Sequence, residues 1–324
     1  MAAKTPFIQR LSRTRLGDMG FWLRRAIRRN SISPSWFYDA PLDAAQLDRL
    51  QAVASAVRQH GGPAVVILHG VMPRSGTNYL AELLALHPDV VVHPLGIREL
   101  PLLALVPEAR HWQEAFLEFY RGNETVFADL ELFAYAISGL MRRIEHHYRD
   151  TRLVVLKVPH TRFISYFPAF FPKDRCIMLL RDGRHVVQST IATWPLKPFG
   201  KSFADICQEW TYATHAALDY WQVCDTNVTS LQRYEDIVSA PHERMETLLD
   251  FLGLDPARYS FDRIKTLPVF GSSEVSKRNG EVVWEPVKVD GSFNPARRKI
   301  QWSPRQERLF ASIAGPAMRR AGYE

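Results

Sequence analysis

The chain has 324 residues, of which 46% are hydrophobic and 23% are charged, a composition typical of a globular protein with a sizeable core. Its formal net charge is +7, but residues 1–30 hold eight basic side chains and a single acid, so the rest of the chain is neutral overall. A neutral body argues against nucleic acid as a partner, because it lacks the bulk positive field that attracts polyanions.

The three cysteines, Cys176, Cys207 and Cys224, are scattered and form no CxxC pair. This spacing argues against a disulfide framework or a cysteine zinc site and fits a reducing compartment. No apolar run reaches the roughly 18 residues that a membrane span needs. The N-terminus also lacks the apolar core of a secretory signal. The sequence therefore predicts a cytoplasmic protein.

Residues 1–30 are predicted to form a basic amphipathic arm. The apolar stripe on one helical face consists of Met19, Trp22, Leu23, Ala26 and Ile27, and the other face carries Arg24, Arg25, Arg28 and Arg29. Such a helix can make peripheral contact with an anionic membrane. It can equally dock its apolar stripe on the protein's own body. Its Arg-rich, acid-poor composition is also that of a mitochondrial transit peptide.

The rest of the chain alternates helical patterns with short apolar runs rich in β-branched residues. Strands alternating with helices predict an α/β fold, in which helices cover both faces of a central parallel sheet. Strands are predicted over 64–68, 153–156, 176–180 and, as a weaker run, 228–231. Helices are predicted over 42–60, 77–86, 111–121, 130–149, 184–194 and 202–224. Helical additions follow over 241–252 and 303–321.

A loop of small residues follows the first predicted strand and leads into a helix. At such a junction successive backbone N–H groups and the helix dipole attract anions. The loop differs from the GxxxxGK[ST] pattern of nucleoside triphosphate sites, because no lysine precedes its hydroxyl residue. It predicts an anion site, with a plain tight turn as the alternative. The candidate ligands are Arg74, Ser75, Gly76, Thr77 and Asn78.

A second candidate site follows the third predicted strand, in the segment Arg181-Asp182-Gly183-Arg184. Arg181 leaves the strand at its carboxyl end, where open α/β sheets bind their ligands. Ser189 lies eight residues later, about two turns into the next helix. A guanidinium and a hydroxyl in these places could hold a second phosphate. Taken alone, the segment is also typical of a charged surface turn.

The two segments together resemble the nucleotide-binding motifs of sulfotransferases that use 3′-phosphoadenosine 5′-phosphosulfate (PAPS). The branch with the tyrosylprotein sulfotransferases also contains Pro-Arg-Ser-Gly-Thr and Arg-Asp-Gly-Arg, here at 73–77 and 181–184. The resemblance is clearest over 64–254. It implies a P-loop-like three-layer fold, with the 5′-phosphosulfate at the first loop, the 3′-phosphate at the second, and no metal. It also implies that the arm precedes a single sulfotransferase domain over 31–324.

The resemblance further assigns the residues of sulfuryl transfer. Lys157 ends the second predicted strand, where the family places a lysine that contacts the transferring group; a side chain that extends into solvent is the alternative. Glu99 is the preferred base for the acceptor proton. It follows His-Pro-Asp at 87–89 as the glutamate of the tyrosylprotein branch does, but several residues later. His160 is second, one residue later than the histidine of the cytosolic enzymes, and His93 is third.

Tyr234 follows the fourth predicted strand and matches the family's Tyr-Glu segment near the nucleotide; a packing role is the alternative. The predicted activity is direct in-line transfer of the sulfuryl group from PAPS to a hydroxyl or amine acceptor. A P-loop kinase and a non-catalytic membrane-associated module are the alternative functions. The acceptor class stays open among saccharides, lipids, peptides and small metabolites.

Overall fold

The computed structural model describes residues 32–58, 62–119, 122–123, 126–194, 200–270, 277–278, 281–282, 285–287 and 299–323. The predicted arm, residues 1–30, lies outside the described residues. Across the described ranges, no helix combines the length and the apolar character needed to cross a bilayer.

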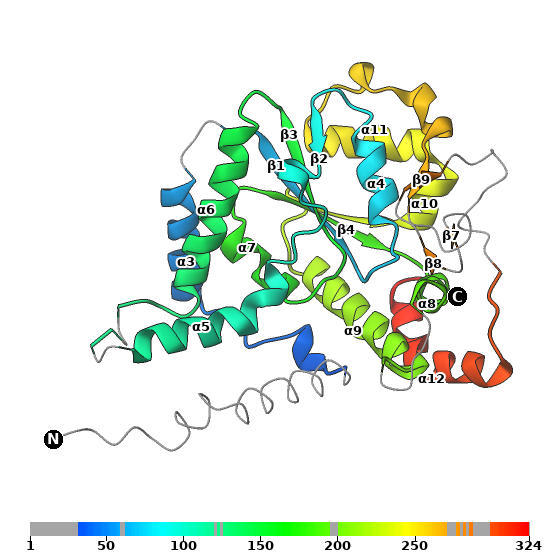
Figure 1. The fold of residues 1–324 in the computed structure, drawn as a ribbon, viewed down its shortest axis with the longest axis horizontal. Coiled ribbons are helices and arrows are strands. Elements are labelled where there is room, and N and C mark those ends of the chain that lie inside the picture. Colours follow the sequence, from blue (N-terminus) through cyan, green and yellow to red (C-terminus); the bar gives the residue numbers. More distant parts are fainter. Residues whose placement is uncertain are drawn as a thin grey trace.

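A parallel sheet of five strands forms the centre of the molecule (Figure 1). Its strand order is β2-β3-β1-β4-β5, so the first strand in the chain is the middle one in space. The strands are β1 (Ala64–Gly70), β2 (Val90–Val92), β3 (Leu153–Val158), β4 (Arg175–Leu180) and β5 (Thr229–Arg233). Because all the pairs are parallel, the segments that follow β1, β3 and β4 leave the sheet at the same edge.

The register brings these strand ends close to one another. Lys157 pairs with Leu68 of β1, and Leu179 of β4 pairs with Gly70 on the other side. The residues of β1, β3 and β4 are almost all buried on both faces, as expected for a parallel sheet under two helical layers.

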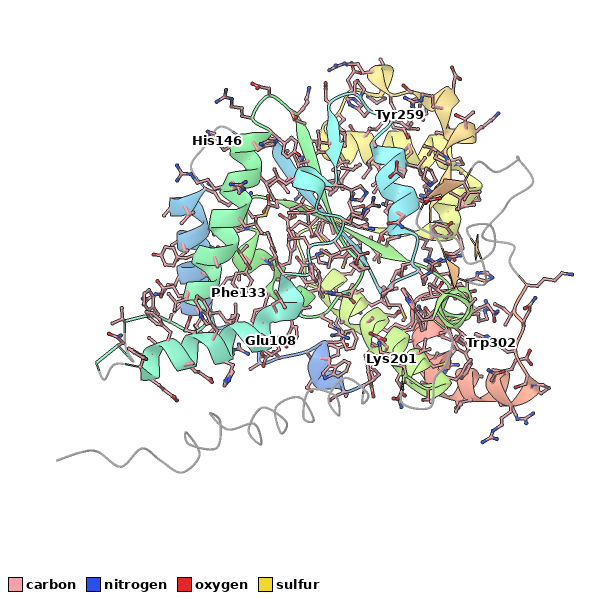
Figure 2. All side chains as sticks on the ribbon, in the orientation of Figure 1. Glu108, Phe133, His146, Lys201, Tyr259 and Trp302 are labelled. Carbon is pink, nitrogen blue, oxygen red and sulfur yellow. The ribbon has the colours of Figure 1, made fainter. Side chains whose placement is uncertain are left out.

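Two separate hydrophobic clusters cover the two faces of the sheet. Phe133 belongs to the larger cluster and Tyr259 to the smaller one, and Figure 2 shows them on opposite sides of the sheet. The larger cluster is formed with helices α3 (Ala44–Val57), α5 (Val106–Glu118), α6 (Glu131–His147), α7 (Phe167–Phe170), α8 (Gly183–Thr193), α9 (Phe203–Trp221) and α12 (Pro304–Arg320). The smaller is formed with α4 (Thr77–Leu84), α10 (Tyr234–Ser239) and α11 (Pro241–Leu252).

The predicted α/β class is confirmed, and each predicted strand is present. The strand β2 was not predicted, because its three valines are too few to give a pattern and it lies at the edge of the sheet. Helix α5 begins at Val106 rather than 111, with Pro107 in its first turn, a position that suits proline. Two short antiparallel pairs were also not predicted. They join β6 (Val269–Phe270) to β9 (Pro286–Val287) and β7 (Lys277–Arg278) to β8 (Glu281–Val282).

Candidate functional site

The loop between β1 and α4 has the backbone shape of an anion site. Arg74 and Gly76 both have left-handed backbones, with φ of 81° and 99°. A left-handed residue between right-handed neighbours turns successive N–H groups toward one side. A non-glycine residue such as Arg74 in this region also indicates local strain, which gathers at functional sites. Gly76 is the N-cap of α4 and has no side chain to cap the first N–H groups.

Ser75 shapes this loop from inside. It is fully buried, and its Oγ donates to the carbonyl of Met72 at 2.7 Å while accepting from the N–H of Met72 at 3.2 Å. The hydroxyl of Ser75 is therefore engaged within the loop itself. Its contribution to anion binding would come through the loop conformation that it stabilises.

The structure brings the two predicted phosphate motifs into direct contact. The Nε of Arg74 donates to Ser189 Oγ on α8 at 3.0 Å. In return, the Nη1 of Arg181 donates to the carbonyl oxygen of Arg74 at 2.8 Å. The sequence predicted these residues for separate phosphates, and the contact places both cations at one edge of the sheet.

Tyr234, the first residue of α10, lies between the two motifs. Its ring packs so closely on Gly76 that a Cβ at that position would collide with it. The guanidinium carbon of Arg181 lies 4.3 Å from the centre of the same ring. Tyr234 is only 5% exposed, so it fills the space between the two motifs. The packing role given as the alternative is therefore present in the structure.

The turn that carries Arg181 is fixed by α9. Trp210 Nε1 donates to the carbonyl of Arg181 at 3.3 Å. A Cβ on Gly183 would lie 2.7 Å from the indole of Trp210, which is why a glycine is needed there. Asp182 caps α8 by accepting from the N–H of Arg184 at 2.8 Å. Arg181 is thus presented by a rigid turn.

Lys157 points into the site rather than toward solvent. Its side chain is 6% exposed, and its Nζ donates to the amide oxygen of Asn78 and lies 3.5 Å from Glu99 Oε1. The alternative of a solvent-directed lysine is therefore wrong. Burial lowers the pKa of Lys157, and the carboxylate of Glu99 opposes that shift by favouring the charged form.

The segment with Glu99 is fastened directly to β3. The N–H of Leu100 donates to the carbonyl of Lys157 at 2.9 Å, which fixes Glu99 beside the lysine. Glu99 is half-exposed, with 51% of its side chain open to solvent. A carboxylate that is both open and adjacent to the buried cation is accessible to a substrate hydroxyl.

Sequence reasoning missed a second carboxylate, Glu82, on the face of α4 one turn beyond Asn78. Burial raises the pKa of Glu82, while the charges of Lys157 and Arg98 lower it. Its Oε1 lies 3.9 Å from the Nε2 of His93, the third base candidate. Burial and then the charges of Lys157 and Arg98 lower the pKa of His93. The helical spacing of four from Asn78 could have indicated Glu82.

His160 lies at the exit of β3, but no hydrogen bond or ion pair joins its ring to Lys157 in the described part of the chain. Its carbonyl accepts from the Nδ1 of the buried His69 on β1 at 3.0 Å. Burial and the nearby charge of Arg162 lower the pKa of His160 to about 3. His160 is therefore neutral at physiological pH, and so low a pKa makes its ring a weak base.

A second aromatic residue beside Tyr234 was also missed. The ring of Tyr79, on α4, meets the ring of Tyr234 edge to face, with 6.0 Å between the centroids. Burial raises the pKa of the Tyr79 phenol to about 12. Its position directly after Asn78, a predicted ligand, could have indicated that Tyr79 lies near the site.

Three cations therefore lie at neighbouring strand ends: Arg74 after β1, Lys157 at the end of β3 and Arg181 after β4. One open carboxylate, Glu99, adjoins them. Such an arrangement can bind a multiply charged anion and accept a proton from a neighbouring hydroxyl. In the described ranges no cluster of three or more His, Cys, Asp or Glu side chains could hold a metal ion.

The chain is similar to known proteins over most of its length. It is 25% identical over 270 residues to protein-tyrosine sulfotransferase 1 of Danio rerio, covering 80% of this chain and 72% of the relative. It is 25% identical over 268 residues to the Homo sapiens protein of the same name, covering 80% of this chain and 70% of that one. Among solved structures, the sulfotransferase domain from the curacin biosynthetic pathway aligns with a TM-score of 0.48 and 19% identity, covering 81% of this chain and 98% of the domain.

A model of the sulfotransferase family matches residues 66–258, which is more than half of the chain. This range includes both phosphate motifs as well as Glu99 and Lys157. The family predicted from the motifs is confirmed. The chain belongs to the sulfotransferase family and is an enzyme of that family.

Proposed function

We propose that this sulfotransferase moves the sulfuryl group of PAPS directly to a hydroxyl or amine of an acceptor, with Glu99 as the base. The observation that carries the proposal is the contact of Lys157 with both Asn78 of the first loop and Glu99. A buried cation, a phosphate-type loop and an open carboxylate meet there. These are the groups that in-line transfer from a charged donor requires.

The residues fit a donor with two separate anionic ends. The loop of Arg74–Asn78, with its left-handed turns and the start of α4, suits the 5′-phosphosulfate. Arg181 and Ser189 suit the 3′-phosphate, the group that distinguishes PAPS from ATP. Their links to Arg74 support one continuous nucleotide site. PAPS would supply an activated sulfuryl group with a phosphate leaving group.

In the proposed transfer step, each bond that forms is matched by one that breaks, and the proton has an acceptor. The acceptor oxygen forms a bond to sulfur as the bond from sulfur to the 5′-phosphate oxygen breaks. Glu99 takes the acceptor proton, and adenosine 3′,5′-bisphosphate leaves. Lys157 stabilises the negative charge that develops on the leaving oxygen, and burial strengthens this interaction. Asn78 orients the lysine through its amide oxygen.

Glu99 is favoured over His160 by its position. Glu99 contacts Lys157 and is half-exposed, so an acceptor can reach it from solvent. His160 is tied to β1 through its carbonyl, and its lowered pKa makes its ring a poor proton acceptor.

The acceptor class is the open part of this proposal. The relatives are called protein-tyrosine sulfotransferases, so a tyrosine side chain is the first acceptor to test.

Replacing the base tests the proposal. Glu99→Gln keeps the shape of the side chain and is expected to lower turnover by about a hundredfold or more, because general base catalysis is lost. Binding of adenosine 3′,5′-bisphosphate should be unchanged, since Glu99 faces the acceptor. Both are measured with labelled PAPS, a panel of tyrosine, saccharide and lipid acceptors, and titration calorimetry.

His160→Asn is the matched control and should retain most of the activity. Full turnover in Glu99→Gln together with its loss in His160→Asn would transfer the role of base to His160.

We further propose residues 31–324 as a single catalytic domain, because the two core clusters share one sheet. A cytoplasmic location, and peripheral membrane contact through residues 1–30, stay predictions.

A further inference from the structure

The last residues of the chain lie against the turn that carries Arg181. Tyr323 follows α12, and its hydroxyl donates to Glu235 Oε2 at 2.9 Å. The other oxygen of this carboxylate, Oε1, accepts from the backbone N–H of Asp182 at 3.0 Å. One carboxylate thus joins the end of the chain to the residue that directly follows Arg181.

Arg233 connects the same segment to the end of β5. Its guanidinium donates to the carbonyl of Ala321. It also stacks on the ring of Tyr323, with 4.9 Å from the guanidinium carbon to the ring centre. Tyr323 is therefore held by its ring and by its hydroxyl, from two residues that flank Tyr234.

Three consecutive residues, Arg233 to Glu235, consequently link the C-terminal segment to both phosphate motifs. Arg233 and Glu235 hold residues 321–323. Between them, Tyr234 packs on Gly76 of the first loop and on the guanidinium of Arg181. A shift of the C-terminal segment would therefore act on the second motif through a short, defined chain of contacts.

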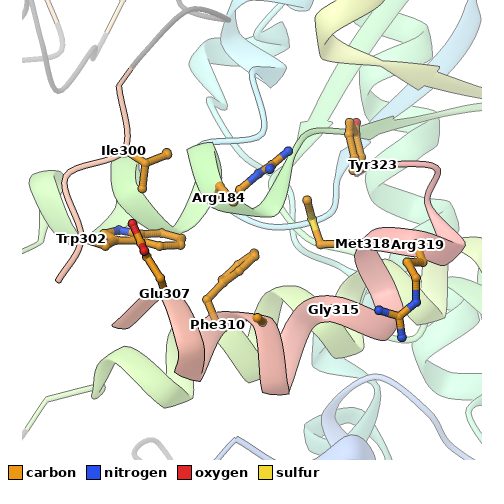
Figure 3. Close-up of a pocket in the computed structure, with 10 residues that line it drawn as sticks. Arg184, Ile300, Trp302, Glu307, Phe310, Gly315, Met318, Arg319 and Tyr323 are labelled. Carbon is orange, nitrogen blue, oxygen red and sulfur yellow. The ribbon is translucent and has the colours of Figure 1, made fainter. Parts of the chain in front are cut away.

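The space between α12 and the start of α8 is partly open. A pocket of about 420 Å³ lies between them, and its lining includes Arg184, Phe310, Met318 and Tyr323 (Figure 3). The guanidinium of Arg184 reaches back to the carboxylate of Asp182 in its own turn. The turn at 181–183 therefore has two supports, Trp210 of α9 on the carbonyl of Arg181 and Glu235 on the N–H of Asp182.

The phenol of Tyr323 is a permanent donor in this arrangement. Burial, and next the carboxylate of Glu235, raise the pKa of Tyr323 above its usual range. The hydroxyl therefore keeps its proton at neutral pH. Glu235 in turn has both carboxylate oxygens engaged, which fixes its orientation.

We propose that Tyr323 and Glu235 are positioning residues for the 3′-phosphate site, acting through the N–H of Asp182 on the placement of Arg181. This inference rests on the proposed use of PAPS. Without the Tyr323 hydroxyl, Glu235 can rotate, the turn at Asp182 is held less firmly, and Arg181 must be ordered when the nucleotide binds. The free-energy cost of ordering Arg181 lowers the affinity for the nucleotide. The stability of the fold is little changed, because the ring of Tyr323 and the core remain packed.

Tyr323→Phe removes the hydroxyl and keeps the ring on Arg233. It is expected to raise the Kd of adenosine 3′,5′-bisphosphate about five- to tenfold by titration calorimetry, less than the full effect of losing one hydrogen bond to a charged group, because the loss reaches the nucleotide only through Glu235 and Asp182. Glu235→Ala should weaken binding at least as much. Glu235→Gln should restore most of the affinity, since its carbonyl can accept from Asp182 and its amide can donate to Tyr323.

A matched control separates this role from a general loss of stability. The hydroxyl of Tyr38 also donates to a carboxylate, Asp219 Oδ2, at 3.0 Å, and this bond joins the start of the described chain to α9; the ion pair of Asp219 Oδ1 with Arg320, at 2.6 Å, does not depend on it. Tyr38→Phe loses the same kind of bond and should leave the Kd unchanged. The double variant Tyr323→Phe/Glu235→Ala should bind no more weakly than Glu235→Ala, because the two residues act in one chain of contacts.

An unchanged Kd in Tyr323→Phe, with binding by the unaltered protein intact, would overturn the positioning role alone. An equal loss in Tyr38→Phe, or strictly additive losses in the double variant, would overturn it as well. If the unaltered protein does not bind adenosine 3′,5′-bisphosphate, the proposed function itself fails.

Discussion

Lys157 is the residue on which the proposed chemistry depends most. An ammonium group buried at a strand end costs free energy unless it is paired. Here the cost is offset by Asn78 and Glu99, which hold the Nζ at the point where three strand ends meet. A residue kept buried and charged at such a cost is typical of a functional site.

The lowered pKa of Lys157 gives a testable pH dependence. In the proposed mechanism the amine of Lys157 stabilises the leaving group only while it is protonated, so activity should fall as pH rises through the lowered pKa, below the usual lysine range. Lys157→Arg keeps the charge to much higher pH. The alkaline limb of kcat/KM should therefore move upward in this variant, even if its maximum is lower. Identical limbs in the two proteins would assign the titration to another group.

At the residue scale, the sequence predicted positions better than contacts. Arg74, Arg181 and Ser189 were chosen from strand ends and spacing and Lys157 from the family resemblance, and all four lie at one edge of the sheet; their roles stay predictions. The hydrogen bond between Arg74 and Ser189 could not be predicted from the sequence, because it joins residues 115 positions apart through tertiary packing.

The loop and the helix that follow β1 form one element whose shape depends on Gly76. Its φ of 99° is unfavourable for any residue with a Cβ, and the ring of Tyr234 occupies the place of that atom. The close approach couples the first motif to α10.

Gly76→Ala is therefore expected to cost about 3 kcal/mol in the free energy of unfolding and to weaken nucleotide binding strongly. Gly139→Ala is the matched control, because Gly139 lies on the exposed face of α6 with nothing within 4 Å of the added atom. It should stabilise the protein by about 0.5–1 kcal/mol and leave binding unchanged. Denaturant unfolding and calorimetry measure both, and a tolerated Gly76→Ala would contradict the packing described for Tyr234.

The pairing of β1 with β3 includes a buried histidine that makes stability depend on pH. Burial lowers the pKa of His69 to about 4, while its Nδ1–H donates to the carbonyl of His160. Between pH 6.5 and 4 the unfolded chain binds a proton that the folded chain does not, so acidification favours unfolding.

The contribution of His69 is on the order of 3 kcal/mol, present above pH 6.5 and lost by about pH 4. His69→Asn keeps a donor to His160 and removes the titration. Its free energy of unfolding should fall less steeply over this window than that of the unaltered protein. Parallel pH profiles would show that His69 does not titrate on unfolding.

At the element scale, the apolar runs of β1, β3 and β4 predicted the central strands because both their faces are buried. The edge strand β2 gave too short a run to be predicted. The hydrogen bond from Tyr323 to Glu235 could not be predicted either, since a single tyrosine after a helix gives no periodic pattern.

The molecule as a whole is organised by the strand order. With β1 between β3 and β4, the loops that carry Arg74 and Arg181 and the end of β3 that carries Lys157 become neighbours at one sheet edge. The net charge of +7 belongs to residues 1–30, so these cations act as individual groups in a neutral body. Their number and placement suit a nucleotide with two separate anionic ends.

Titration calorimetry with adenosine 3′,5′-bisphosphate, in the absence of metal, tests this account most directly. The protein should bind it more tightly than ATP with magnesium, because we propose that Arg181 and Ser189 hold the 3′-phosphate. Arg181→Ala should weaken this binding by about tenfold or more, the effect of losing a charged hydrogen-bond donor. Tighter binding of ATP with magnesium, or unchanged affinity in Arg181→Ala, would contradict the account.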